Sequence, residues 1–390
     1  MGVSGMRVVH VSDCYPPRTG GIESQVRDLA AHQVAAGHTV HVLTATAAAD
    51  GGLRTTSTEV SGVRVHRMAS AVTFGLPVHP LGGRLTRRAF ELLEPDVVHV
   101  HAGVVSPFAH DGARAARALG VPLAIPWHCL LTGLEAAVRL GATLTGWRTA
   151  PAALSAVSRV AAERVAAAFG RDDVAVVTNG LDVEKWRPLP PRAAPSTRAG
   201  EPLRVVATQR LAPRKRAVPL VRAFARALGE LGRSPDGARP ALLTVVGSGP
   251  DELAVRREAD RLGVADAVTL LGRVDRAALP ALYRGQDVFL SATEKEAFGL
   301  AALEARAAGL AVVARAGTGM SEFVTDGTDG FLTDDDGGLA AALVRLARDA
   351  GLRERVLVHN RSVAPAADFA DVLAAAEREY ARAAGLVTAG

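Results

Sequence analysis

Cysteines, aromatic residues and lysines are all scarce in this chain of 390 residues, and each scarcity excludes a class of protein. Cys14 and Cys129 stand far apart, so neither a disulfide framework nor a cysteine metal site is predicted, and a reducing compartment is expected. No run of about 18 apolar residues occurs, so no segment is predicted to span a membrane. The N-terminus carries no basic stretch followed by an apolar one, so no secretory signal is predicted. We therefore expect a cytoplasmic protein.

Aromatic residues make up only 4% of the chain, which argues against a protein that stacks single-stranded nucleic acid on aromatic rings. The net charge of +5 suits an anionic ligand or an anionic surface and does not choose between them. Only three of the 45 basic residues are lysines, namely Lys185, Lys215 and Lys295. In a chain so biased toward arginine, a lysine that falls within a candidate site is of interest.

Hydrophobic residues make up 48% of the chain and charged residues 22%, which is typical of a globular protein. At roughly 100–200 residues per domain, the length predicts two domains. Short valine-rich runs alternate with amphipathic, alanine-rich stretches, and this pattern predicts βαβ units around a parallel sheet. The pattern stops in a proline-rich segment between Trp186 and Pro202, which we interpret as a semi-rigid linker, and then restarts.

The fold class expected is α/β, with residues 1–188 as a first Rossmann-like domain, 189–368 as a second, and 369–390 as a C-terminal helix that packs back on the first. Two such domains leave a cleft between them, and ligands of open α/β sheets bind beyond the carboxyl ends of the strands. The strands are predicted at Arg7–Val11, Thr39–Thr44, Val63–Met68, Asp96–His101, Pro122–Trp127, Leu154–Ser158 and Val174–Thr178, and then at Arg204–Gln209, Ala241–Gly247, Ala267–Gly272, Asp287–Thr293 and Ala311–Ala316.

The segment from Glu296 to Glu304, with the sequence EAFGLAALE, carries the most information. Glu296 is predicted in a loop after a strand, and Glu304 about two turns inside the helix that follows. The N-terminus of that helix can hold a diphosphate, and the two carboxylates can accept hydrogen bonds from sugar and ribose hydroxyls. The plain alternative is that one glutamate complements the helix dipole and the other is solvated.

A basic loop, from Arg210 to Lys215, follows the first strand of the second half. Arg210 and Lys215 can converge on phosphates, the arginine as a fork and the lysine as a point charge. The alternative is a solvated basic loop. The rarity of lysine in this chain favours a functional role for Lys215, because a leaving nucleoside diphosphate needs its charge neutralised.

Gly20 and Gly21 lie between the first strand and the first helix, where glycines let the backbone approach a ligand and the helix offers free N–H groups. An ordinary glycine turn, with Glu23 as a first-turn acid, is the alternative. This segment is not the dinucleotide-binding pattern G-x-G-x-x-G, and Gly247-Ser-Gly249 also fails that pattern, which argues against a nicotinamide-dependent oxidoreductase.

His128 ends a predicted strand, where it can hydrogen-bond a phosphate or a sugar hydroxyl, although a lone histidine is more often structural. His99 and His101 alternate on one strand, and at least one of them is expected in the core. Because no third ligand stands at a suitable spacing, no metal site is predicted. Val274, just after another strand, can offer backbone groups to a nucleobase.

Together these motifs resemble retaining glycosyltransferases of family GT4, which have the GT-B fold. The resemblance covers nearly the whole chain, and the order and spacing of the motifs make it specific. The motifs that carry it are the following: Pro16-Pro17 with Gly20-Gly21 and Glu23, Gly37-His38, residues 95–101 (PDVVHVH), Asn179-Gly-Leu-Asp182, Arg210-Leu with Lys215, Gly247-Ser-Gly249-Pro250, and residues 296–304.

The resemblance implies a role for each of these residues. Glu296 would hold the transferred sugar, Glu304 the nucleotide ribose, and Arg210 with Lys215 the diphosphate. The segment Phe298-Gly299-Leu300 would line the sugar and phosphate pocket. His128 and the Gly20-Gly21 loop would face the reacting centre and the acceptor from the first domain. The chain departs from the family at Gln209, where glycine is usual, and at Gly317-Thr318-Gly319, where adjacent glycines are common.

The implied activity is transfer of a hexosyl group from a UDP- or GDP-sugar to an acceptor hydroxyl on a glycolipid, polysaccharide or metabolite, with retained anomeric configuration. The resemblance implies no metal, no other cofactor and no nucleic-acid partner. A sugar-nucleotide 2-epimerase and a non-catalytic nucleotide-sugar-binding protein remain the alternatives. Arg84, Arg87 and Arg88 share one face of a predicted helix, and this face is either solvated or a peripheral contact with an anionic membrane.

Overall fold

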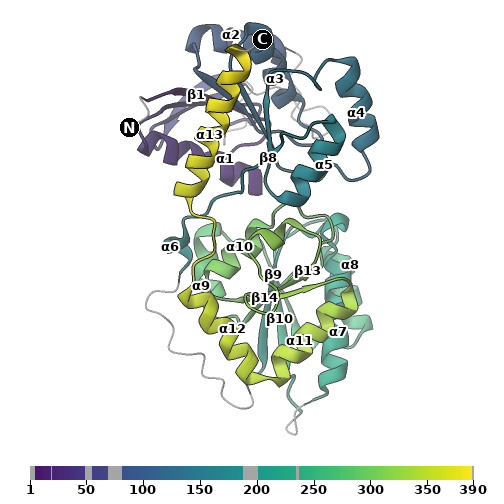
Figure 1. Cartoon of the computed structure of the whole chain (residues 1–390). Helices are drawn as coiled ribbons and strands as arrows, with labels where there is room; N and C mark the ends of the chain where they lie inside the picture. Colours follow the sequence, from purple (N-terminus) through teal and green to yellow (C-terminus); the bar gives the residue numbers. More distant parts are fainter. Residues whose placement is uncertain are drawn as a thin grey trace. The chain divides into compact units, whose positions relative to one another are not determined.

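The structure is a computed structural model that describes residues 5–18, 20–48, 55–68, 81–187, 201–233 and 237–388. The chain divides into two compact α/β units (Figure 1). The first unit comprises Met1–Gly180 together with Phe369–Gly390, and the second comprises Leu181–Asp368. Each unit is built on a single sheet, so the predicted fold class of two parallel-sheet domains is confirmed.

The sheet of the first unit has the strand order β3-β4-β2-β1-β5-β6-β7-β8. All neighbouring strands pair in parallel except β3, which runs antiparallel to β4. The strands are β1 (Arg7–Ser12), β2 (Thr39–Thr44), β3 (Thr56–Val60), β4 (Val63–Arg67), β5 (Val97–Val100), β6 (Leu123–Trp127), β7 (Ala153–Ala156) and β8 (Ala175–Val176).

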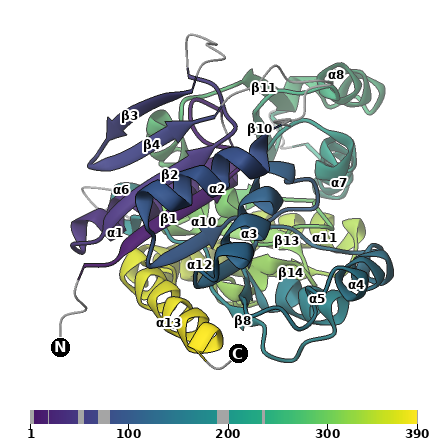
Figure 2. The ribbon, with the colours of Figure 1, turned by 90° about the horizontal axis from the view of Figure 1, so that it is seen from above.

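Side chains alternate across β1, because successive residues of a strand point to opposite faces. Val9 and Val11 pack in the core cluster that includes Phe90 of α2 and Phe108 of α3. Val8 instead packs with Tyr380 of α13. Helices therefore cover both faces of the sheet, and Figure 2 shows α2 and α3 side by side across the strands. The helices are α1 (Gly21–Ala35), α2 (Gly82–Leu93), α3 (Pro107–Leu119), α4 (Glu135–Leu144), α5 (Arg159–Phe169) and α13 (Phe369–Thr388).

The antiparallel hairpin β3–β4 departs from the purely parallel sheet that the valine runs predicted. Its two-residue turn is Ser61-Gly62, and both residues have positive φ, 53° and 77°. Such a turn matches the twist of two antiparallel strands, so a short hairpin forms at the edge of the sheet. The Ser-Gly pair was a sequence signal for this hairpin, and β3 itself is exposed and has no apolar run to reveal it.

The sheet of the second unit is entirely parallel, in the order β11-β10-β9-β12-β13-β14. The strands are β9 (Leu203–Thr208), β10 (Ala241–Val246), β11 (Val268–Gly272), β12 (Val288–Leu290), β13 (Ala311–Arg315) and β14 (Gly330–Thr333). The helices are α6 (Val183–Trp186), α7 (Ala217–Leu231), α8 (Glu252–Arg261), α9 (Leu279–Tyr283), α10 (Leu300–Ala307), α11 (Asp336–Arg348) and α12 (Ala350–Ser362). Within this unit, α7, α8 and α11 lie on one side of the strands, and α9 and α10 lie on the other (Figure 1).

The chain passes between the units near Gly180 and again near Phe369. The helix that starts at Phe369 contacts α1, β5, β6 and β7, so it packs on the first unit as predicted. Residues 181–187 belong to the second unit, where the Trp186 ring lies 5.9 Å from the ring of Tyr283. Most of the predicted linker, residues 188–200, lies outside the described residues.

Both sheets reverse their strand order at a central strand. In the first unit β1 lies between β2 and β5, and in the second unit β9 lies between β10 and β12. Such switch points are where open α/β sheets bind ligands, beyond the carboxyl ends of the strands. Within the described parts of the chain, no helix is both long enough and apolar enough to cross a membrane.

Candidate active site

Two loops leave the switch point of the second unit, one after β9 and one after β12, and they bring Lys215 to Glu296. The Lys215 ammonium forms an ion pair with the Glu296 carboxylate, and the two side chains are 22% and 20% exposed. Both side chains are partly buried but still reach solvent, so a ligand can approach the ammonium and the carboxylate and compete for them. Lys215 is then free for a phosphate, and Glu296 for sugar hydroxyls.

Arg216 holds these two loops together. Its backbone is left-handed, with a φ of 55°, and its guanidinium donates to the Ala292 carbonyl at 3.1 Å and to Asp336 at 2.6 Å. The Thr293 hydroxyl also donates to the Lys215 carbonyl, at 3.3 Å. Arg216 thus fixes the position of the neighbouring Lys215.

The N-terminus of α10 follows Glu296 directly, and glycines allow the approach. Gly299 precedes the helix with a φ of 97°, and a Cβ there would come within 2.6 Å of Met320. A Cβ on Gly319 would come within 1.9 Å of the Ala297 carbonyl oxygen, and the Gly319 N–H donates to the Glu296 carbonyl at 2.9 Å. The first turn of α10 has N–H groups with no partner inside the helix, which suits a phosphate.

Glu304 lies within α10 and is buried, 7% exposed. Its carboxylate pairs with Arg276 at 2.8 Å, and the Arg276 guanidinium also lies 5.7 Å from the ring centre of Trp186. The neighbouring Tyr283 donates its hydroxyl to Thr208, the last residue of β9, at 3.0 Å. Burial, together with the Glu304 charge, raises the pKa of Tyr283, so its phenol stays protonated.

Sequence reasoning missed Arg276 and Tyr283. They lie 28 and 21 positions before Glu304, in a segment with no motif of its own, so only the fold brings them to the carboxylate. Gln209 is a further feature, because its side-chain nitrogen is buried without a hydrogen-bond partner among the described residues. At this position, where the family usually has glycine, the chain therefore carries an amide donor one residue beyond β9.

The remaining candidates of the second unit lie at the same end of the sheet but contribute differently. Arg210 is exposed, and no hydrogen bond or ion pair joins its side chain to another described residue. Val274 is partly exposed, two residues beyond β11. Phe298 is only 2% exposed and packs on Phe323, so its backbone and not its ring is available to a ligand. Leu300 is partly exposed in the first turn of α10.

At Gly317-Thr318-Gly319 the chain lacks the adjacent glycines that are common in the family, but it keeps glycine at both positions where the fold needs one. Gly317 has a φ of 67°, and Gly319 is the residue that meets the Ala297 carbonyl. Thr318 between them is fully buried, and its hydroxyl donates to the Arg315 carbonyl at 2.9 Å. The threonine is therefore bonded within its own loop.

In the first unit, Gly20 and Gly21 are exposed at the N-terminus of α1, as predicted from their place after β1. The Glu23 carboxylate folds back so closely that a Cβ on Gly20 would come within 2.3 Å of its oxygen. Arg18 pairs with this carboxylate at 3.5 Å, and burial raises the pKa of Glu23. A side chain at Gly20 would therefore require the Glu23 carboxylate to move aside, whereas the Gly20 φ of 173° is itself open to any residue.

His128 follows β6 at the carboxyl edge of the same sheet and is partly exposed. Its Nε2 lies 3.0 Å from Nδ1 of His101, which is buried. Burial lowers the pKa of His128 to about 4, so the ring is neutral at pH 7. A neutral imidazole can accept one hydrogen bond and donate another.

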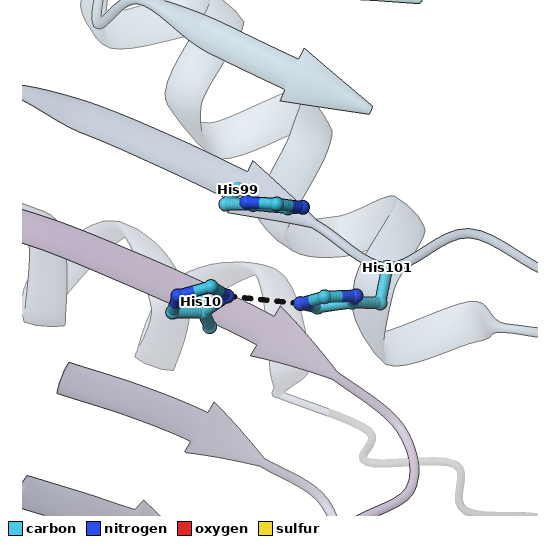
Figure 3. A group of neighbouring side chains, drawn as sticks. All are labelled: His10, His99 and His101. Carbon is cyan, nitrogen blue, oxygen red and sulfur yellow. Dashed lines mark hydrogen bonds between the residues drawn. The ribbon is translucent and has the colours of Figure 1, made fainter. Parts of the chain in front are cut away.

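His99 and His101 do have a third histidine beside them, which the sequence analysis did not find. His10 of β1 joins them because β1 and β5 are adjacent strands, and Figure 3 shows the three rings lying nearly parallel. The His10 Nδ1 lies 2.9 Å from the His101 Nε2, which is a hydrogen-bond distance, whereas two nitrogens on one tetrahedral zinc are roughly 3.3 Å apart. Because lone pairs lie in the ring planes, these stacked rings do not converge on one ion.

Comparison with known proteins agrees with a sugar-transferring site of this kind. Residues 19–185 match the family described as Glycosyltransferase Family 4, and residues 193–360 match the family described as Glycosyl transferases group 1. A GDP-mannose-dependent alpha-(1-6)-phosphatidylinositol monomannoside mannosyltransferase from Mycobacterium tuberculosis is 30% identical over 354 residues, covering 84% of this chain and 85% of that protein.

Solved structures agree on the fold. Sucrose-phosphate synthase from Thermosynechococcus elongatus superposes with a TM-score of 0.76 at 20% identity, covering 97% of this chain and 98% of that chain. Anabaena HepE, solved in complex with UDP and glucose, superposes with a TM-score of 0.72 at 20% identity, covering 96% and 98%. The fold and the site define a nucleotide-sugar-dependent glycosyltransferase with GT-B domains. The chain belongs to glycosyltransferase family 4.

Proposed function

We propose that this glycosyltransferase moves a hexosyl group from a UDP- or GDP-sugar to an acceptor hydroxyl and retains the anomeric configuration. The observation that carries the proposal is the Lys215–Glu296 ion pair beside the N-terminus of α10, at the switch point of the second sheet. This arrangement offers a cation and a helix terminus to the diphosphate and a carboxylate to the sugar. No metal and no other cofactor enters the scheme.

In the proposed reaction the acceptor attacks the same face from which the diphosphate leaves, through an oxocarbenium-like ion pair. The bond between the anomeric carbon and the phosphate oxygen breaks, the glycosidic bond forms, and the leaving phosphate takes the acceptor proton. Lys215 and Arg210 stabilise the negative charge that develops on the diphosphate. Glu296 holds the sugar hydroxyls and Glu304 the ribose hydroxyls, because carboxylates accept and hydroxyls donate.

The donor choice follows from the relatives. The 30% identical mannosyltransferase is named for GDP-mannose, and HepE was solved with UDP, so both bases are candidates here. The acceptor of that mannosyltransferase is a phosphatidylinositol mannoside, so a glycolipid is the first acceptor class to try. Polysaccharide and small-metabolite acceptors follow.

The deciding experiment has two stages. A thermal-shift screen of UDP, GDP and ADP and of their sugars identifies the donor, because a ligand that binds only the folded protein raises its apparent stability. The donor found is then incubated with candidate acceptors, and NMR of the product reports its anomeric configuration. Transfer with retention supports the proposal, whereas an inverted product, or an epimerised donor without transfer, contradicts it.

The same proposal includes a peripheral membrane contact from the cytoplasmic side. Arg84, Arg87 and Arg88 are exposed together on α2, although Arg87 and Arg88 lie 3.1 Å and 3.8 Å from Glu91. A basic helix face is attracted to anionic lipid. Flotation with liposomes that contain anionic lipid should fall when the three arginines are replaced by glutamine. Equal flotation of the parent and the variant would remove this contact from the proposal.

A further inference from the structure

A continuous chain of hydrogen bonds crosses the first unit and ends at His128. At its helical end lies Tyr380 of α13, whose hydroxyl accepts from the side-chain nitrogen of Gln33 at 2.6 Å and also lies 2.6 Å from the Nδ1 of His99, on a side branch. The Gln33 oxygen lies 2.6 Å from the His10 Nε2. The His10 Nδ1 lies 2.9 Å from the His101 Nε2, and the His101 Nδ1 lies 3.0 Å from the His128 Nε2. The chain therefore joins two helices to the edge of the sheet through five side chains.

All members of this chain except His128 are buried, and His128 is the one that reaches solvent. Burial lowers the pKa of His10 to about 4 and that of His101 well below its usual value, so both are neutral at pH 7. A neutral imidazole carries one proton, so each ring donates from one nitrogen and accepts at the other. The positions of the protons along the chain are consequently linked.

The Gln33 amide sets the direction of the chain. Its carbonyl oxygen can only accept, so His10 must carry its proton on Nε2 and accept at Nδ1. His101 must then donate from Nε2 and accept at Nδ1, and His128 must donate from Nε2. One amide, separated from His128 by two histidines, thus decides which nitrogen of His128 is protonated.

We propose that Gln33 holds His128 as its Nε2–H tautomer through the two histidines between them, and that His128 thereby presents Nδ1 as a hydrogen-bond acceptor to a substrate hydroxyl. This inference rests on the proposed function and on the place that the family resemblance implies for His128, facing the reacting centre. Gln33, His10 and His101 are positioning residues, since they act through His128. Without this chain His128 would be a mixture of tautomers. In some molecules its Nδ1 would then carry a proton and could not accept a hydrogen bond from the substrate hydroxyl.

The tautomer can be measured without any substrate, by long-range 1H–15N NMR of protein labelled in its histidine rings. The His128 signal is assigned by its loss in the His128→Gln variant. In the unsubstituted protein at pH 7, His128 is expected to be protonated on Nε2 and unprotonated on Nδ1. A signal showing the proton on Nδ1 overturns the proposal, and this outcome needs no further variant.

The Gln33→Met variant tests the origin of the tautomer. Methionine has a similar length but no acceptor oxygen, so His10, His101 and His128 are expected to become mixtures of tautomers. The His41–His66 pair, joined at 2.9 Å elsewhere in the same sheet, is an internal control that should not change. Unchanged His128 signals in a folded Gln33→Met variant overturn the proposal.

Tyr380→Phe is the matched control, because it removes a polar group from the same chain but leaves the Gln33 oxygen on His10. The His128 tautomer is expected to persist there, and its loss overturns the directional role of Gln33. Where transfer is measurable, Gln33→Met should lower kcat by about three- to tenfold and leave the donor KM within twofold. If Gln33→Met alters the His128 tautomer but leaves kcat unchanged, the positioning role is overturned. If the unsubstituted protein holds His128 as the Nε2–H tautomer but transfers no sugar, the result counts against the proposed function alone.

Discussion

Lys215 and Glu296 are each about one-fifth exposed, so their ion pair is mostly buried but still reaches solvent. The exposed part leaves both side chains accessible to a ligand that offers a phosphate and a hydroxyl together. Glu304 is held differently, because it is buried beside Arg276 and Tyr283. Glu296 can therefore exchange its lysine partner for a ligand, whereas the side chain of Glu304 is held in position by its neighbours.

At the residue scale, Lys215→Ala should lower kcat/KM by about 10²–10³-fold, because it removes a charge that stabilises the leaving diphosphate. Lys185→Ala is the control, since Lys185 is an exposed lysine whose ammonium pairs with Asp182, three residues earlier in the chain. Steady-state kinetics with the donor found by thermal shift make the comparison. A Lys215→Ala enzyme within threefold of its parent would count heavily against this role.

Glu304→Gln should weaken nucleoside-diphosphate binding by about tenfold, because a charged acceptor for the ribose hydroxyls becomes a neutral one. Isothermal titration calorimetry measures the change. Glu252→Gln, which alters a partly exposed glutamate paired with Arg256 on α8, is expected to leave the affinity unchanged. Equal affinities of the two variants would show that Glu304 does not contact the nucleotide.

The turn that enters α10 is the element on which the site geometry depends. Gly299 combines a left-handed φ of 97° with close contact to Met320, so neither its backbone nor its surroundings admit a side chain. Gly319 closes the same turn from the other side by donating to the Glu296 carbonyl. The position of Glu296 relative to the helix N-terminus therefore follows from two glycines that do no chemistry.

At this scale, Gly299→Ala should destabilise the second unit by about 1–3 kcal/mol and lower donor affinity, because the turn must shift away from Met320. Gly229→Ala is the matched control within α7, where an added Cβ meets nothing within 4 Å. That change should stabilise the protein by up to about 1 kcal/mol, as alanine favours a helix. Urea unfolding gives both values, and a neutral Gly299→Ala would refute the argument.

At the scale of the whole molecule, burial lowers the pKa of several of the described histidines, and all of these histidines lie in the first unit. The pKa of His10, His41 and His128 falls from 6.5 to about 4. In the unfolded chain these histidines become protonated below about pH 6.5, whereas in the folded unit they stay neutral down to about pH 4. The folded unit therefore loses stability as the pH falls from 6.5 to 4. Asp13 and Glu23 act in the opposite sense, since burial raises the pKa of Asp13 to about 6 and also raises the pKa of Glu23. They are outnumbered, because burial also lowers the pKa of His66, His99, His101 and His110 in this unit.

The first unit should accordingly unfold more easily at pH 5 than at pH 7, by up to about 2 kcal/mol for each such histidine. Trp127 and Trp147 report on the first unit and Trp186 on the second. Urea unfolding followed by fluorescence, in a Trp186→Phe variant and in a variant that keeps only Trp186, separates the two units. If the midpoints of both units fall equally between pH 7 and pH 5, the histidines do not control acid stability.

The amino-acid sequence by itself determined the alternation of strands and helices, the two-domain division and the place of each motif after a strand. These features are local: a valine run, a helical period or a glycine turn specifies its own segment. Glu296, Glu304, Arg210 and Lys215 were found for that reason, since each stands in the loop or the helix that directly follows a strand. The antiparallel β3–β4 hairpin is a local feature that was not predicted, although its turn residues Ser61-Gly62 signal it.

Only the tertiary structure decided which side chains meet. Arg276 reaches Glu304 across 28 positions, His10 reaches His101 across 91, and Gln33 reaches Tyr380 across 347. No local period encodes such contacts, because they arise when parallel strands are laid side by side and helices close over them. Burial followed from the same packing, which hid the Phe298 ring and kept the core histidines neutral. The sequence specified the chemical groups, and the fold determined their partners and protonation.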